Sequence, residues 1–404
     1  MATIAVVGTM DSKGAEHAFV AERIREAGHT ALVVDVGTLG AAQVAVDVTR
    51  EEVLAAAGLS LPAAEDRGER VGVMARALPV YLEKMAAEGR MDGVISLGGG
   101  GGTAIATAGM RALPVGFPKL MVSTLVSGNT AHYVGTKDIV MMPSIVDVAG
   151  LNQISRMIFA RAAGAICGMV EARIEQGEEK PLIVASMFGN TTECVDAARQ
   201  ALEGKGYEVL VFHATGTGGR TMESLIESGM VKGVFDVTTT EWADEFCGGT
   251  LTAGPTRLEA AGKMGIPAVV APGCLDMVNF GERESVPAKF EGRNFYIHNP
   301  QVTLMRTNAE ECAALGRILA EKVNAYTGPV AVALPLKAIS IISGEGQAFH
   351  DAEADAALFG AIRANLREGV ELIEVEAGIN DAAFSVTCVE ALLGMMEGSE
   401  PSIL

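Results

Sequence analysis

The feature that most constrains this chain is an alternation of short apolar runs with helical segments. Apolar runs occupy residues 3–8, 30–37, 91–98 and 118–124, and residues 14–28 have helical spacing and end at a glycine. Strands that are apolar on both sides and alternate with helices are typical of a parallel sheet covered on both faces. The sequence therefore predicts an α/β fold with mainly parallel sheets.

The same order of segments occurs twice. Residues 181–219 repeat the strand, loop, helix and strand of residues 3–40, and residues 231–273 parallel residues 91–124. Strands at 329–336 and 370–376 and a last helix near 381–396 complete the second sheet. We expect two Rossmann-like domains, 1–178 and 179–404, joined by a linker within 175–181. Substrates of such a chain would bind in a cleft between them.

Composition excludes several classes of protein. The net charge of −19 argues against a nucleic-acid partner, since such proteins usually present a basic face. No apolar run is long enough to span a membrane, and the first residues lack the pattern of a signal peptide. The six cysteines are scattered, which predicts buried reduced thiols in a cytoplasmic protein.

A run of five glycines gives the strongest functional signal. It lies between a predicted strand and a predicted helix and comprises Gly98, Gly99, Gly100, Gly101 and Gly102, followed by Thr103. Free N–H groups at a helix N-terminus attract anions, and glycine lets a phosphate approach the backbone. The run lacks the lysine of a Walker A loop and the third glycine of a dinucleotide fingerprint. It predicts a phosphate site, with a tight turn as the alternative.

A second loop follows the first predicted strand and reads "GTMDSKG" at residues 8–14. Lys13 can meet a phosphate as a point charge, and Asp11 can hold Mg²⁺ through water. Alternatively, Asp11 or Ser12 caps the helix that follows. Asp35 ends the second strand, where a Rossmann domain places its ribose-binding acid, although such an Asp is also a common turn former.

The second half offers a different set of polar residues. His213 precedes the glycine loop "ATGTGG", Arg220 follows it, and Glu241 lies in a later loop. Arg220 suits a carboxylate or phosphate, and an imidazole can act as acid or base near neutral pH. We interpret the three as candidate catalytic residues. The alternative is that Arg220 forms a structural ion pair and His213 fills space.

At these motifs the chain resembles the ATP-binding family of the tomato mosaic virus resistance protein of tomato and its uncharacterised bacterial relatives. The segments "GTMDSKG", "GGGGGT", "MVSTLVSGNT" at 121–130 and "HATGTGGRTMESLI" at 213–226 carry the resemblance. It implies two Rossmann-like domains, a homodimer, and ATP held by the N-terminal domain through loops 9–13, 98–103 and 123–128. These loops add Thr9, Met10, Ser123, Thr124, Ser127 and Gly128 to the candidate nucleotide site. The chain departs from the pattern at Met10 and Ser12, where the family has Leu and Thr.

Three functions remain open at this stage. The first is an ATP-dependent enzyme acting on a small polar metabolite, with phosphoryl transfer or hydrolysis as the reaction. The second is an ATP-binding sensor or partner protein without turnover, and the third is a dinucleotide-dependent oxidoreductase, which depends on Asp35. The helix near 155–172 carries Ala160, Ala163, Gly164 and Gly168, which predict either a homodimer seam or close packing within its own domain.

Overall fold

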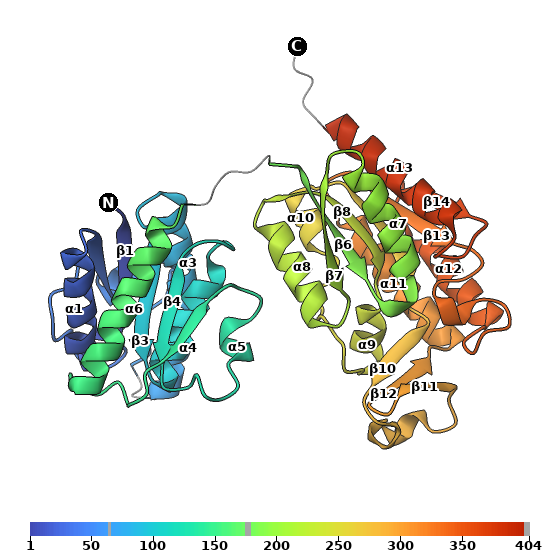
Figure 1. Ribbon diagram of the computed structural model, residues 1–404. Coiled ribbons are helices and arrows are strands. Elements are labelled where there is room, and N and C mark those ends of the chain that lie inside the picture. The colour runs from blue at the N-terminus through green and yellow to red at the C-terminus, as the bar shows by residue number, and fades with distance from the viewer. Residues whose placement is uncertain (64–65, 174–178, 400–404) are drawn as a thin grey trace, which may run out of the picture. The chain divides into compact units, whose positions relative to one another are not determined.

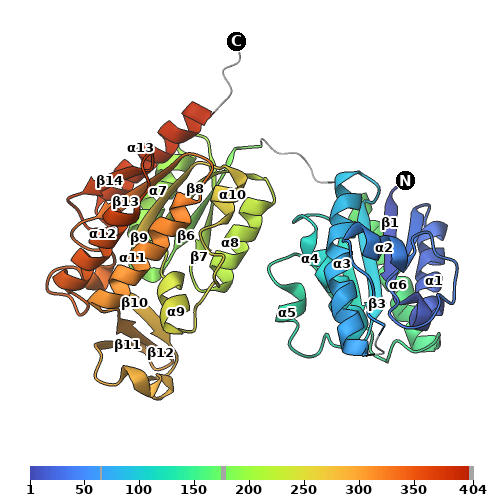
Figure 2. The same cartoon turned by 180° about the vertical axis from the view of Figure 1, so that it is seen from behind.

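The computed structural model describes residues 1–63, 66–173 and 179–399. The chain divides into two compact units, Met1–Gln176 and Gly177–Leu404, and each is described by itself. Most of the predicted linker, 175–178, lies outside the described residues. Figures 1 and 2 show the two units from opposite sides. Both contain a parallel sheet with helices on both faces, which confirms the predicted fold class.

The N-terminal unit contains five strands and six helices among its described residues. They are β1 (Thr3–Gly8), α1 (Met10–Glu26), β2 (Thr30–Asp35), α2 (Arg50–Ala56), α3 (Arg67–Ala87), β3 (Gly93–Gly98), α4 (Gly100–Ala112), β4 (Lys119–Ser123), α5 (Ala131–Val134), β5 (Val140–Pro143) and α6 (Gln153–Glu171).

The sheet of this unit is parallel and runs in the order β2-β1-β3-β4-β5. Alternate residues of β1 point to opposite faces, so Ile4 and Val6 pack against α1 and α6, whereas Ala5 and Val7 pack against α3 and α4. Figure 1 shows α1 and α6 in front of the sheet, and Figure 2 shows α3 and α4. Both faces of every central strand are therefore buried, which is why the strands read as continuous apolar runs.

The C-terminal unit has more elements. They are β6 (Leu182–Met187), η1 (Gly189–Thr191), α7 (Thr192–Glu203), β7 (Glu208–His213), α8 (Thr217–Glu227), β8 (Val231–Thr238), α9 (Glu241–Cys247), α10 (Ala260–Met264), β9 (Ala268–Gly273), β10 (Met277–Phe280), η2 (Arg283–Ser285), η3 (Ala288–Phe290), β11 (Phe295–Asn299), β12 (Val302–Arg306), α11 (Ala309–Asn324), β13 (Val330–Pro335), η4 (Ile341–Ser343), α12 (Ala352–Asn365), β14 (Glu371–Val375) and α13 (Ala382–Ser399).

Its parallel sheet runs in the order β14-β13-β9-β8-β6-β7. Helices α7 and α13 cover one face, and α8, α10, α11 and α12 cover the other. A three-stranded antiparallel sheet, β10-β12-β11, projects from this unit and was not predicted from the sequence. The six cysteines are free and buried, as expected.

The two parallel sheets share one strand order. Numbered from the first strand of each unit, both run 2-1-3-4-5, and the second sheet adds a sixth strand. The repeat seen in the sequence therefore corresponds to a repeated topology. In this order the chain leaves the first strand toward one side and later returns to the other, which creates a switch point between strands 1 and 3. Ligands of open α/β sheets bind outside the carboxyl ends of the strands at this point.

Candidate functional site

The switch point of the N-terminal unit lies between β1 and β3. The loop at 9–13 follows β1, and the glycine run follows β3, so the two loops meet at the carboxyl edge of paired strands. The backbone leaves little room for a side chain here, because a Cβ on Gly98 would lie 3.0 Å from the Gly102 Cα atom. Helix α4 begins inside the glycine run, as the sequence predicted.

The N-terminus of α4 is open. Its cap residue, Gly99, supplies no side-chain acceptor. The N–H groups of Gly100, Gly101 and Gly102 have no hydrogen-bond partner among the described residues, and the first helical bond is from the Thr103 N–H to the Gly99 oxygen. A Cβ placed on Gly100 would meet no atom within 4 Å. The loop therefore presents unpaired donors at the positive end of a 13-residue helix, with open space beside Gly100.

Two polar side chains, those of Arg67 and Thr124, lie near these donors, and Lys13 lies beyond the end of the neighbouring strand β1. Arg67, at the first turn of α3, has its Nη2 atom 3.9 Å from the Cβ position of Gly101. The Thr124 hydroxyl lies 3.7 Å from the Cβ position of Gly99. Lys13 is half-buried in the loop after β1, at a non-helical kink in α1. Neither Lys13 nor Arg67 has a side-chain partner within the described part of the chain, so both cations are free to meet an anion.

The turn after β4 holds the other residues that the family resemblance implicates. Ser127 and Gly128 are exposed there, and the Gly128 N–H donates to the Leu125 oxygen at 3.0 Å. No contact joins them to the glycine run among the described residues.

Two predicted ligand hydroxyls face inward instead. Thr103 and Ser123 are fully buried, and their hydroxyls hydrogen-bond each other at 2.7 Å. The Ser123 hydroxyl also accepts the Leu125 N–H. These two side chains therefore join α4 to the end of β4 and hold the glycine run in place, which corrects the prediction that Thr103 adds a hydroxyl to the ligand.

The acids of this edge are engaged by the backbone. Asp35 is buried, and its Oδ1 accepts the N–H groups of Met10 at 3.0 Å and Gly37 at 2.8 Å. It caps α1 and closes a turn, so the ribose-binding role predicted for it does not fit. Burial raises the pKa of Asp35, and these two N–H donors oppose the shift. The Met10 side chain is wholly in the core, so only its backbone belongs to the loop.

Asp11 and its neighbours shape the same loop. The Asp11 carboxylate accepts the Leu39 N–H at 2.8 Å and so holds the segment after β2. The Ser12 hydroxyl donates to the Thr9 hydroxyl at 3.1 Å. Among the described residues, no cluster of three or more His, Cys, Asp or Glu side chains is arranged to hold a metal ion. Asp11 is thus a single carboxylate, with one of its oxygens already hydrogen-bonded.

One residue of this edge gave no sequence signal. His17 is fully buried beneath Gly8, whose Cβ would lie 2.0 Å from the His17 Nε2 atom. Its Nδ1 lies 2.7 Å from the Lys13 oxygen, and its Nε2 accepts the Leu97 N–H at 3.3 Å. A neutral imidazole with its proton on Nδ1 satisfies both contacts, and burial lowers the pKa of His17. His17 therefore links the Lys13 kink to the end of β3.

The C-terminal glycine loop is closed by the protein itself. The carboxylate of Glu241 accepts the N–H groups of Gly216 at 2.7 Å and Gly219 at 3.0 Å, at the N-terminus of α8. Glu241 is 1% exposed, and a Cβ on Gly219 would lie 2.1 Å from its Oε2 atom. An internal carboxylate thus occupies the position where the sequence predicted a ligand anion.

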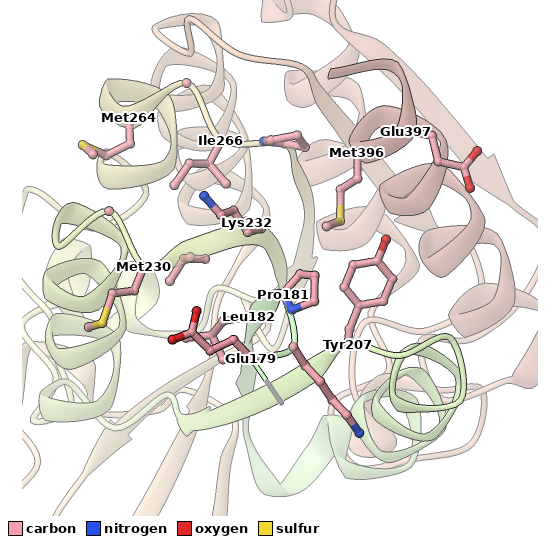
Figure 3. A pocket seen from close by; sticks show the side chains of 15 residues that line it. Glu179, Pro181, Leu182, Tyr207, Met230, Lys232, Met264, Ile266, Met396 and Glu397 are labelled. Carbon is pink, nitrogen blue, oxygen red and sulfur yellow. The ribbon is translucent and has the colours of Figure 1, made fainter. Parts of the chain in front are cut away.

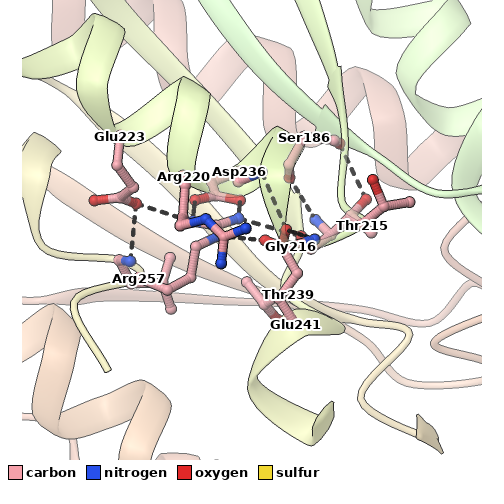
Figure 4. Close-up of polar contacts among 12 residues, drawn as sticks. Ser186, Thr215, Gly216, Arg220, Glu223, Asp236, Thr239, Glu241 and Arg257 are labelled. Carbon is pink, nitrogen blue, oxygen red and sulfur yellow. Dashed lines mark hydrogen bonds and ion pairs between the residues drawn. The ribbon is translucent and has the colours of Figure 1, made fainter. Parts of the chain in front are cut away.

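Glu241 belongs to a buried ion network centred on Arg257 (Figure 4). The Arg257 guanidinium donates to Glu241 at 2.7 Å, to both oxygens of Asp236 at 2.5 and 2.6 Å, and to Glu223 at 3.1 Å. Glu223 also accepts three backbone N–H groups from residues 258–260, at the start of α10. The single cation and two helix N-termini together balance three carboxylates, so the cluster is structural.

The three predicted catalytic residues do not form one site. Arg220 is exposed and donates to the Thr252 oxygen at 3.1 Å and the Thr217 hydroxyl at 3.3 Å. The ring of His213 lies 5.3 Å from that of Phe188, and no hydrogen bond joins it to Arg220 or Glu241. Sequence proximity to one glycine loop misled the prediction, because the end of β7 and the first turn of α8 direct these side chains to different surroundings.

A cavity of about 840 Å³ lies at the opposite edge of the C-terminal sheet. Figure 3 shows Tyr207, Met230, Lys232 and Met396 around it. It lies at the amino ends of β6 and β8, next to the negative C-terminal ends of α8 and α10. Ligand sites of open parallel sheets lie at the carboxyl edge instead.

Of the helices described, none has the length and apolar character needed to cross a bilayer.

Fold and site together define a two-unit α/β protein whose N-terminal unit carries, at its switch point, a helix N-terminus with three N–H groups that have no partner among the described residues. The chain belongs to the uncharacterised protein family UPF0261: the N-terminal domain of that family matches residues 2–175, and its C-terminal domain matches residues 180–396.

The relatives extend along the whole chain. A UPF0261 protein of Clostridium tetani is 48% identical over 399 residues, which cover 98% of this chain and 99% of that protein. The ToMV resistance protein Tm-1(GCR237) of Solanum lycopersicum is 36% identical over 96% of this chain, which spans 55% of the tomato protein. These matches confirm the family resemblance. A solved UDP-N-acetylglucosamine 2-epimerase from Rickettsia bellii covers 66% of this chain and 78% of its own, with 12% identity and a TM-score of 0.22.

Proposed function

We propose that the N-terminal unit binds ATP, with the triphosphate at the N-terminus of α4. One observation carries the proposal: at the β1/β3 switch point the N–H groups of Gly100, Gly101 and Gly102 have no partner among the described residues, and open space lies beside Gly100. A phosphate supplies acceptors for such donors and is stabilised by the helix dipole.

The charges around the glycine run support a polyanion. Arg67 lies beside the run and Lys13 lies beyond the end of the neighbouring strand β1, and neither has a side-chain partner within the described residues. Mg²⁺ is commonly held by nucleotide phosphates together with one or two carboxylates, and it keeps several waters. Asp11 is the acid of the loop after β1, so it is the residue we assign to a Mg²⁺ ion that arrives with ATP. The family resemblance favours ATP over other anions.

The proposal is confined to nucleotide binding. The residues predicted to perform catalysis are separated, with Glu241 buried in the Arg257 network and Arg220 held by backbone and hydroxyl oxygens. The dinucleotide hypothesis loses its main support, because the Asp35 carboxylate caps α1. A homodimer and a second small-molecule ligand remain predictions. On α6, Gly164 and Gly168 are exposed, as a homodimer seam requires, whereas Ala163 packs within its own unit.

Calorimetric titration of the full chain tests the proposal. Gly100→Val places a branched side chain in the space that the phosphate requires, and we expect ATP affinity to fall at least about tenfold, or roughly 1.4 kcal/mol. Gly360→Val is the matched control, because this helical glycine of α12 also has no atom near its Cβ position. ATP titrations in the presence of MgCl₂ and in the presence of EDTA show how much Mg²⁺ contributes to ATP affinity. Unchanged ATP affinity in a folded Gly100→Val protein, or no binding by the wild type, refutes the proposal.

A further inference from the structure

A second cavity lies at the carboxyl edge of the C-terminal sheet, and the proposed function does not use it. Its volume is about 370 Å³. Its walls come from the loop after β6, the end of β7, the β11–β12 hairpin and η4, and they include Phe188, Asn190, His213, Tyr296, His298 and Ile342. It adjoins β6, one of the two strands at the switch point of this unit.

Within the described part of the chain, the cavity is lined by two histidines and by no residue with a permanent charge. Two imidazoles, His213 and His298, line it from different elements, and neither ring has a hydrogen-bond partner within the described residues. No Asp, Glu, Lys or Arg is among the residues that line it. In a chain with a net charge of −19, this wall therefore has no carboxylate that would repel an anion.

The remaining wall is apolar and aromatic. Phe188 packs against the His213 ring, and Tyr296 makes an edge contact with Phe349, with ring centroids 6.4 Å apart. Tyr296 is 38% exposed and Ile341 is 50% exposed, so the rim presents apolar surface to a ligand. In addition, the N–H groups of Gly189 and Asn190 have no acceptor within the described residues. Aromatic walls with a few convergent polar groups are typical of small-molecule sites.

We propose that this cavity binds a small organic anion with an aromatic or apolar body. The body packs against Phe188, Tyr296 and Ile342, and the carboxylate or phosphate accepts hydrogen bonds from His213 and His298. Arg220 has no part in this site, since its guanidinium is held at the Thr252 loop. The inference is independent of ATP, because every lining residue belongs to the C-terminal unit.

Histidine NMR of the full chain, labelled with ¹³C in its imidazole rings, tests this proposal with phenyl phosphate, benzoate and benzyl alcohol as probes. We expect phenyl phosphate or benzoate to shift the His213 and His298 resonances saturably, with at least tenfold higher affinity than uncharged benzyl alcohol. Either anion alone suffices, and the preferred one identifies the head group. His213→Ala and His298→Ala should each weaken binding at least tenfold, whereas His132→Ala, in the other unit, should not.

Repeating the titration on the Gly100→Val protein separates this site from the proposed ATP site. The shifts of His213 and His298 should persist in that protein. Equal affinity for benzyl alcohol and both anions, binding unaffected by both histidine substitutions, or loss of the shifts in the Gly100→Val protein would each overturn the proposal.

Discussion

Helix α4 follows the third strand of its unit and α8 follows the second strand of its own, and both begin in a glycine-rich loop at the carboxyl edge of a parallel sheet. Within the described part of the chain, the first turn of α4 has three N–H groups without a partner, and open space lies beside Gly100. At α8, the N–H groups of Gly216 and Gly219 are taken by the carboxylate of Glu241. Two glycine-rich loops thus lead to a helix N-terminus with unpaired N–H groups in one unit and to a helix N-terminus held by an internal carboxylate in the other.

The difference lies outside the loops. Glu241 begins α9, 22 residues after Gly219, and only the fold brings its carboxylate to α8. Near α4, the buried polar side chains are those of Thr103 and Ser123. Their hydroxyls hydrogen-bond each other and do not bond the N–H groups at the start of α4. A glycine loop therefore indicates an anion, and the tertiary structure decides whether the protein or a ligand supplies it.

The largest loss of stability should come from disrupting the Arg257 ion network that holds Glu241 at the N-terminus of α8. Arg257→Met leaves Asp236 and Glu241 buried without their cation, and we expect the C-terminal unit to lose about 3–5 kcal/mol of stability. Trp242, the only tryptophan of the chain, is buried in this unit, so its fluorescence during urea unfolding reports the change. ATP affinity of the N-terminal unit should not change.

The control for this substitution is Arg363→Met. Arg363 pairs with Glu374 at 2.5 Å, but both side chains are about two-fifths exposed, so its loss should cost no more than about 1 kcal/mol. If both variants unfold at the same urea concentration, the Arg257 cluster does not hold the unit together and the contrast with α4 fails.

A second prediction concerns how the stability of the C-terminal unit depends on pH. Burial raises the pKa of Asp244 to about 7, although Asn279 and the Leu251 N–H donate hydrogen bonds to its carboxylate. The folded state therefore binds a proton that the unfolded state, with an Asp pKa near 3.8, has released. Stability from this group is present at low pH and is lost as pH rises from about 4 to 7.

Asp244→Asn should remove that slope, because an amide stays neutral and can donate to the unpaired Asn279 Oδ1 after a flip of the Asn279 amide. We expect the variant to match the wild type within about 1 kcal/mol at pH 4 and to exceed it by about 2–4 kcal/mol at pH 8. Urea unfolding by Trp242 fluorescence measures both. Asp196→Asn, at an exposed carboxylate of α7, is the control. A variant with the wild-type pH profile would contradict the assignment of a proton to Asp244.

The sequence was sufficient for much of this fold. Continuous apolar strands and the repeated segments predicted two α/β halves, and the glycine run marked the start of α4. The antiparallel strands β10–β12 were missed because "MVNF" and its neighbours are short and lack turn signals that separate them from loops. The buried partners Glu241 and Arg257 are 16 residues apart in sequence, and neither spacing nor composition shows that both lie in the core. His17 was equally hidden, as a single histidine on a helix.

The smallest predicted effects distinguish the roles of two hydroxyl groups near the N-terminus of α4, those of Thr103 and Thr124. Thr103→Val removes the buried bond to Ser123 and should cost about 1 kcal/mol of stability in the N-terminal unit, with little change in ATP affinity. Thr124→Val removes a half-exposed hydroxyl that faces Gly99, so it should spare stability and lower ATP affinity about threefold to tenfold. Thermal unfolding and calorimetric titration of both variants give the four values. If Thr103→Val weakens ATP binding more than Thr124→Val does, the inward hydroxyl contributes to the ligand site, and α4 is less open than its unpaired N–H groups indicate.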